Sequence, residues 1–217
     1  TMQDIKAYKP ETNSVSSGQV LHCAYEFDKA KLVVKEMVDL MVLDLVEKGL
    51  VTDQIVLTIG YDIENLTDAD RRRQYYGEIT VDRYGRKVPK HAHGTANLKR
   101  QTSSTHLITD AVMQLYDKIV HPKLLIKRIT VTANHLAEAS RAEQTPKYEQ
   151  LDLFTDYSVQ QEQQAAENAD LEREKRMQKA MIDIKKKFGK NAILKGMNLE
   201  EGATAKDRNE QIGGHKA

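Results

Sequence analysis

The sequence predicts an α+β domain in which two helices cover one face of a four-stranded antiparallel sheet. Four segments alternate apolar and polar residues, as strands do, and two segments repeat apolar residues every three or four positions, as helices do. Their order along the chain is strand, helix, strand, strand, helix, strand, which is the split, ferredoxin-like arrangement. The chain has 217 residues, 40% of them apolar, so we expect one such domain with extensions.

The first half of the domain is predicted to be a strand, a helix and a second strand. Residues 14–27 form the first strand, and one of its faces carries Leu21, Cys23, Tyr25 and Phe27. A helix over 29–50 follows, capped by Asp28 and closed by Gly49, with an apolar stripe of Val33, Val34, Met37, Val38, Met41, Val42 and Leu45. Residues 52–62 form the second strand, with alternating Ile55, Leu57, Ile59 and Tyr61.

The second half repeats the pattern after a long connection. Residues 86–101 are predicted to form the third strand. Ser103 or Ser104 then caps a second helix, which ends at Pro122 and has a stripe of Leu107, Ile108, Ala111, Val112, Leu115 and Ile119. The fourth strand is predicted over 124–136.

The connection between the second and third strands, residues 63–84, is long and polar. With the residues just after it, it interleaves cationic and aromatic side chains, as ribbons that follow nucleic acid do: Arg71, Arg72, Arg73, Tyr75, Tyr76, Arg83, Tyr84, Arg86 and Lys87. The alternative is a solvated hairpin with "DRYG" as its turn and disorder over 63–76.

Two helices on one side leave the other face of the predicted sheet bare. On the third strand this face carries His91, His93, Thr95, Asn97 and Lys99, opposite Val88, Ala92, Ala96 and Leu98. On the fourth strand it carries Arg128, Thr130, Thr132 and Asn134, opposite Ile129, Val131 and Ala133. Such a surface suits phosphate contacts better than base stacking. The same pattern is equally typical of a one-sided sheet that shows its polar residues to water.

The formal net charge of +1 is an average over charged blocks. Residues 71–100 carry a net charge of +7, residues 149–174 carry −7, and residues 175–195 carry +7. The single cysteine, Cys23, excludes an intramolecular disulfide and a thiolate zinc cluster. No apolar run is long enough to span a membrane, and "TMQDIKAYKP" lacks the apolar core of a signal peptide, so we expect a cytoplasmic chain with no membrane partner.

Several separate stretches resemble the C-terminal little-finger domain of Y-family translesion DNA polymerases. They are "YKPETNSVSSGQVL", "KAKLVVKEMVDLMVLDLVEKGLVTDQIVLTIGYD", "DRYGRKVPKHAHGTANL" and "LLIKRITVTANHL". The chain is similar to the UmuC-like branch of Gram-positive bacteria (the ImpB/MucB/SamB family), and the similarity extends to the terminal "RNEQIGGHKA". The resemblance implies the fold derived above, a role in DNA damage repair and the SOS response, and sequence-nonspecific binding to the backbone of primer–template DNA.

The residues that the resemblance assigns to DNA lie in three places. They are Ser16, Ser17, Gly18 and Gln19 at the first strand, Arg86, Lys87, Lys90, His91, His93, Thr95, Asn97 and Lys99 at the third, and Arg128, Thr130 and Thr132 on the fourth. We expect contacts to phosphates, without base readout. His91 and His93 share a face, but no third ligand accompanies them, so we predict no metal site and consider a small metal-dependent enzyme a weak alternative.

The resemblance also implies what this chain lacks. Y-family polymerases hold two metal ions on palm carboxylates in their N-terminal two thirds, and nothing in the sequence matches those carboxylates. We therefore expect this chain alone not to be an enzyme and to have no cofactor. The full-length parent would be a DNA-directed DNA polymerase with Mg²⁺ in its palm.

A short apolar motif stands in the polar stretch after the domain. "QLDLF" (Gln150, Leu151, Asp152, Leu153, Phe154) resembles the pentapeptide with which bacterial polymerases bind the β sliding clamp. We expect Leu153 and Phe154 to be the apolar anchors and Gln150 to bind backbone at the rim of the clamp pocket.

The chain thus divides into five predicted parts. They are a tether from a missing thumb domain (1–13), a little-finger domain (14–139), a linker with the clamp motif (140–157), a polar helix (158–189) and a flexible tail (190–217) that could bind an accessory subunit. The leading hypothesis is a non-catalytic module that binds DNA and docks on the clamp. The alternative is a protein-interaction module whose sheet binds an accessory subunit in place of DNA.

Overall fold

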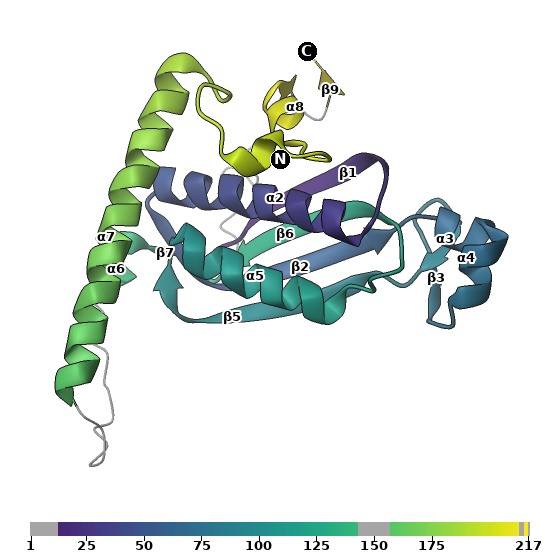
Figure 1. The fold of residues 1–217 in the computed structure, drawn as a ribbon, viewed down its shortest axis with the longest axis horizontal. Coiled ribbons are helices and arrows are strands. Elements are labelled where there is room, and N and C mark those ends of the chain that lie inside the picture. Colours follow the sequence, from purple (N-terminus) through teal and green to yellow (C-terminus); the bar gives the residue numbers. More distant parts are fainter. Residues whose placement is uncertain (1–12, 143–156, 213–214, 217) are drawn as a thin grey trace, which may run out of the picture.

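The centre of the molecule is an antiparallel sheet with two helices on one side (Figure 1). The computed structural model describes residues 13–142, 157–212 and 215–216. The four long strands lie in the order β1–β6–β2–β5, with bounds β1 Val15–Tyr25, β2 Leu50–Tyr61, β5 Ala92–Thr102 and β6 Ile126–Asn134. Each helical crossover skips one strand, since β6 lies between β1 and β2, and β2 lies between β5 and β6. The predicted fold class is confirmed, with a two-residue strand β7 (Ala137–Glu138) added beside β2.

The core lies between this sheet and helices α2 (Phe27–Glu47) and α5 (Thr105–Ile119). The apolar stripes of the two helices and the inner positions of the central strands are buried together: Val33, Val34, Met37, Val38, Val42, Leu45, Ile55, Leu57, Ile59, Ile108, Val112, Ile129, Val131 and Ala133. Ser104 caps α5, and its hydroxyl accepts a hydrogen bond from the amide of Leu107 at 3.3 Å. After α2, Gly49 has φ 66°, a left-handed conformation that glycine adopts without strain.

One glycine of the sheet allows close packing between layers. Gly94 lies on the inner face of β5, where a Cβ atom would come within 2.9 Å of Leu115 and 3.1 Å of Ile119 on α5. A residue with a side chain at this position would push α5 away from the sheet.

Two details at the junction of β1 and α2 differ from the sequence prediction. The register of β1 shifts between Val20 and Tyr25, so the predicted alternation breaks there, and Cys23 is exposed while Leu21 is buried. Helix α2 begins one residue before Asp28, which lies in the first turn, where the positive end of the helix dipole stabilises its negative charge. The N-cap residue, Glu26, makes no side-chain cap bond.

The connection after β2 is ordered, so the alternative that residues 63–76 are disordered is wrong. It forms helices α3 (Glu64–Thr67) and α4 (Ala69–Gln74) and a hairpin of β3 (Ile79–Val81) and β4 (Lys87–Pro89). Asn65 fixes α3 because its buried side-chain amide exchanges hydrogen bonds with both backbone groups of Leu125, at 2.8 and 2.9 Å. The predicted "DRYG" turn is confirmed, with the amide of Gly85 bound to the carbonyl of Asp82.

The chain after the sheet returns to the domain. Helix α6 (Ala139–Ala142) is followed, beyond the undescribed residues, by the long helix α7 (Tyr157–Phe188), whose first turns project past the sheet in Figure 1. The last elements are η1 (Gly196–Leu199), α8 (Ala205–Asn209), β8 (Gln211–Ile212) and β9 (His215–Lys216). Over 190–212 the structure therefore has folded segments where the sequence predicted a flexible tail. Of the described helices, none is both long and apolar enough to cross a membrane.

Candidate nucleic-acid interface

The face of the sheet opposite α2 and α5, here called the open face, is built from rows of side chains that run across the strands. Paired residues on neighbouring strands point to the same face of the sheet, so their side chains lie next to each other across the strands. The rows, read from β1 towards β5, are Asn134–Gln54–Asn97 on the last three strands, Ser16–Thr132–Val56–Thr95, Gly18–Thr130–Thr58–His93 and Val20–Arg128–Gly60. The strand faces predicted for β5 and β6 are confirmed by this register and by burial.

Hydrogen bonds between these side chains hold the surface in one arrangement. Gln54 bridges three strands, since its oxygen accepts from Asn134 Nδ2 at 3.1 Å and its Nε2 donates to Asn97 Oδ1 at 2.9 Å. The hydroxyls of Ser16 and Thr132 pair at 2.9 Å. A linked polar surface of this kind loses little side-chain freedom when it meets a ligand.

The charged side chain in the paired rows of the open face is a cation, Arg128. Arg128, His91 and His93 are exposed there, Lys99 is exposed two positions beyond Asn97 on β5, next to a register shift, and the paired rows contain no Asp or Glu. The Nδ1 atom of His93 pairs with the hydroxyl of Thr58 at 2.9 Å. Cationic groups among hydroxyls and amides can bind phosphate oxygens without selecting a base.

The four residues predicted to bind DNA at β1, which are 16–19, lie alternately on the two faces of the strand. Ser16 and Gly18 lie on the open face, paired with Thr132 and Thr130. The side chains of Ser17 and Gln19 point to the helix side, where they bond with Arg208 and Thr204 of the C-terminal segment at 3.2 and 3.3 Å. Ser17 and Gln19 therefore do not join the open face through their side chains.

The predicted basic residues before β5 lie along the hairpin. Arg86 pairs with Asp82, with 2.8 Å between Nε and Oδ2, and a backbone hydrogen bond from Arg86 lowers the pKa of the Asp82 carboxyl. Lys87 is exposed on β4. Lys90 is paired with Glu78 at 2.7 Å. Of these three cations, Arg86 lines a groove that continues from the open face.

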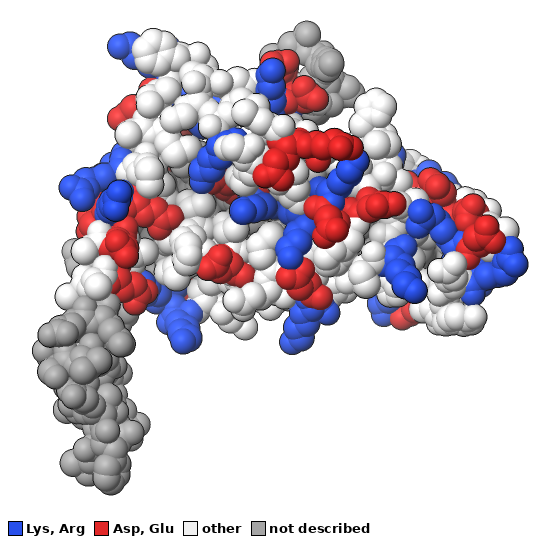
Figure 2. Space-filling view, viewed as in Figure 1, with Lys and Arg blue, Asp and Glu red and all other residues white. Residues whose placement is uncertain are grey.

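The helix side of the domain carries charges of both signs. Figure 2 views the helix side, where acidic and basic side chains are intermingled over the surface. One example is Lys31 of α2, which pairs with Asp117 of α5 at 2.6 Å. Mixed signs of this kind give no extended positive field for a polyanion.

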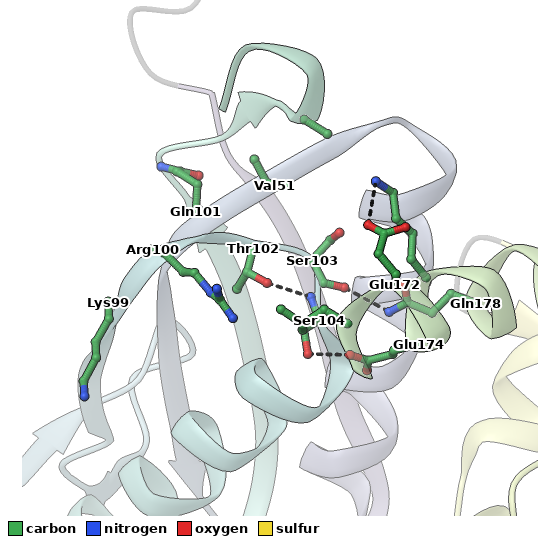
Figure 3. Close-up of a pocket in the computed structure, with 13 residues that line it drawn as sticks. Val51, Lys99, Arg100, Gln101, Thr102, Ser103, Ser104, Glu172, Glu174 and Gln178 are labelled. Carbon is green, nitrogen blue, oxygen red and sulfur yellow. Dashed lines mark hydrogen bonds and ion pairs between the residues drawn. The ribbon is translucent and has the colours of Figure 1, made fainter. Parts of the chain in front are cut away.

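Helix α7 is fixed to the domain at the start of α5 (Figure 3). The carboxylate of Glu174 accepts hydrogen bonds from Ser104 Oγ at 2.6 Å and from the amide of His106 at 3.1 Å, so it neutralises the amino-terminal end of α5. Gln178, which is buried, donates to the carbonyl of Ser103 at 2.9 Å. In Figure 3 Arg100 points towards this contact, and it pairs with Glu167 of α7.

The segment after α7 covers α2, and it is bound through two buried carboxylates. Glu36 of α2 is fully buried, and its oxygens accept from the amides of Thr204 and Ala205 at 2.7 and 3.1 Å and from Asn198 Nδ2 at 2.8 Å. Asp39, one turn further on, pairs with Lys195. Both partner sets come from residues 195–205, so this part of α2 is covered by the chain itself.

The clamp motif at 150–154 and nearly all of the 1–13 tether lie outside the described residues. In the part of the chain that the structure describes, no group of three or more His, Cys, Asp or Glu could hold a metal ion. The rings of His91 and His93 lie edge to face, with centroids 6.4 Å apart.

The sequence prediction missed the contribution of β2 to the open face. Gln54 and Thr58 lie at its centre and make the cross-strand hydrogen bonds described above. The signal was present, because these polar residues alternate with Ile55, Leu57 and Ile59 on a strand whose inner face was correctly predicted.

Fold and surface together define a class: a β-α-β-β-α-β domain with one covered face and one open, polar, cationic sheet face. The chain belongs to the impB/mucB/samB family C-terminal domain, whose family model matches residues 12–153. This family is the C-terminal region of Y-family translesion polymerases, which implies a DNA polymerase as the parent and a place in DNA repair. None of the curated proteins compared with the chain matches it.

Proposed function

We propose that this chain is the part of a UmuC-like translesion polymerase that holds primer–template DNA, with the open face along the phosphate backbone. The observation that supports this most directly is the open face itself. It is continuous across four strands, it carries Lys99 and Arg128 with two histidines, and its described rows contain no carboxylate. Nucleotide addition would then fall to the palm of the parent polymerase and its Mg²⁺ ions.

Docking on the β sliding clamp through "QLDLF" (150–154) is the second part of the proposal. The motif lies at the very end of the family match, which reaches residue 153, and its Leu153 and Phe154 are the kind of apolar anchors that dominate peptide docking. Holding the polymerase on the clamp would raise its local concentration at the primer end.

Charge reversal on the open face tests the DNA-binding role. The double variant Lys99→Glu, Arg128→Glu should bind duplex DNA about tenfold more weakly at low salt. The slope of log affinity against log salt concentration should also be less negative by about 2. Each lost phosphate contact removes roughly one released counterion from that slope. The measurement is a fluorescence anisotropy titration at several salt concentrations.

A matched control separates this effect from net charge. Lys35→Glu, Lys118→Glu makes the same charge change on exposed positions of α2 and α5, on the helix side. We expect it to keep the wild-type salt slope. If the open-face variant kept both the affinity and the slope of the wild type, the DNA-binding role would be refuted and the protein-interaction alternative favoured.

A further inference from the structure

A groove of about 610 Å³ lies between the open face and the β3–β4 hairpin. One wall is the end of the open face, with Gly60, His91 and Arg128, and the other wall is the hairpin, with Tyr84 and Arg86. Its volume is in the range of sites that hold small molecules. The groove is therefore a continuation of the proposed DNA surface, at the end where the sheet meets the hairpin.

The hairpin presents a flat aromatic and cationic group at this groove. The guanidinium carbons of Arg83 and Arg86 lie 4.8 and 5.1 Å from the ring centroid of Tyr84. The turn beneath them is held by Asp82, whose carboxylate accepts from the amides of Tyr84 and Arg86 at 2.8 and 2.9 Å. Gly85 completes the turn with φ 78°. The group is thus fixed in place before any ligand arrives.

The apolar side chains at this groove are largely exposed to solvent. Tyr84 is 64% exposed, and two further apolar lining residues, Val20 and Val81, are 60% and 64% exposed. Phosphate contacts alone would not favour exposed apolar side chains. Unpaired nucleic-acid bases do, because they stack on tyrosine rings and guanidinium planes.

The charge of the lining residues indicates which kind of planar ligand fits the groove. Arg83, Arg86, Arg128 and Lys127 line the groove, and of its two acidic residues Asp82 is already paired with Arg86. A nucleotide combines a stacking base with a negative phosphate, so it matches both properties of the groove. A peptide would have to be acidic and aromatic to match them, and it would not explain why the groove continues the open face.

We propose that this groove binds an unpaired nucleotide of the DNA strand that continues beyond the duplex on the open face. The base stacks on the Tyr84 and guanidinium group, and the flanking phosphate lies near Arg128 and His91. This inference rests on the proposed DNA-binding function and adds a second binding mode to it, selective for single-stranded DNA at a duplex end.

Three probes can isolate the stacking contact. They are a blunt duplex, the same duplex with a thymidine overhang, and the same duplex with an abasic overhang, which keeps the phosphates and removes the bases. The wild-type chain should bind the thymidine overhang at least about fivefold more tightly than the abasic one, the effect of one stacked base. Equal affinity for the two overhangs would overturn the inference and leave the groove to a peptide partner.

Tyrosine variants then locate the contact. Tyr84→Ala should abolish the preference for thymidine over abasic overhangs, and Tyr84→Phe should keep it because the ring remains. Tyr76→Ala is the matched control, since Tyr76 is 94% exposed in the same connection and does not line the groove. A preference that survives in Tyr84→Ala would also overturn the inference. If the blunt duplex were not bound at all, the proposed function itself would fail, which is a different result from equal binding of the two overhangs.

Discussion

Replacing Glu36 with glutamine should release the C-terminal segment from α2 while leaving the sheet intact. The charged oxygens of Glu36 accept from two backbone amides and from Asn198 Nδ2. A glutamine can keep an oxygen towards Thr204 and Ala205, but it then turns its NH₂ group against the NH₂ group of Asn198. Asn198 cannot turn its side chain without losing the bond that its oxygen accepts from the amide of Lys195.

The size of the effect follows from these contacts. Hydrogen bonds to a charged group contribute about 1.5–3 kcal/mol each and neutral ones about 0.5–1.5 kcal/mol. The substitution removes one bond and makes the others neutral, so we expect a loss of at least about 3 kcal/mol. That loss corresponds to an increase of roughly 150-fold in the opening equilibrium of residues 196–209.

Native-state hydrogen exchange measures this opening amide by amide. Amides of 196–209 should lose about a hundredfold of protection, and those of β2 should change little. Glu47→Gln is the matched control on the same helix, because Glu47 pairs with Lys186 at 3.0 Å on the surface, where such pairs contribute at most about 1 kcal/mol. Protection of 196–209 within threefold of the wild type in Glu36→Gln would refute the reasoning. An equal loss in β2 would show that Glu36 supports the core instead.

Two further predictions concern the sheet and the clamp. Gly94→Val should lower the free energy of unfolding by about 1–3 kcal/mol, measured by urea denaturation, because its Cβ would meet Leu115 and Ile119 at 2.9 and 3.1 Å; an unchanged midpoint would mean that α5 can move away freely. Leu153→Ala with Phe154→Ala should remove most of the affinity for purified sliding clamp, at about 2 kcal/mol or more for each anchor, with duplex binding retained. Unchanged clamp affinity would exclude this motif as the docking site.

The parts of the fold that could be predicted are those set by local periodicity. The inner and outer faces of β5 and β6 follow from a repeat of two, and the stripes of α2 and α5 follow from a repeat of 3.6. The cap of α5 could be narrowed to Ser103 or Ser104, because a cap depends only on the next few residues, and Ser104 is the one that caps it.

The parts that could not be predicted depend on partners far away in the sequence. Helix α3 is fixed by Asn65, whose bonds go to Leu125, sixty positions away. Glu36 stands outside the apolar stripe of α2, and it is buried because residues 198–205 cover it. The tail is polar, as disordered segments are, so its composition predicted a flexible segment over 190–212. The tail is folded because its partners are buried carboxylates on another helix.

The length and attachment of α7 also decide where a clamp could sit. The helix has 32 residues, and at 1.5 Å per residue it is a rod of about 48 Å. It is fastened to the domain through Glu174 and Gln178, and its first turns project away from the sheet (Figure 1). Phe154 precedes the first helical residue, Tyr157, by only three positions. If the clamp binds this motif, as proposed, it would therefore be held within the reach of three residues, about 10 Å, of the projecting end of α7.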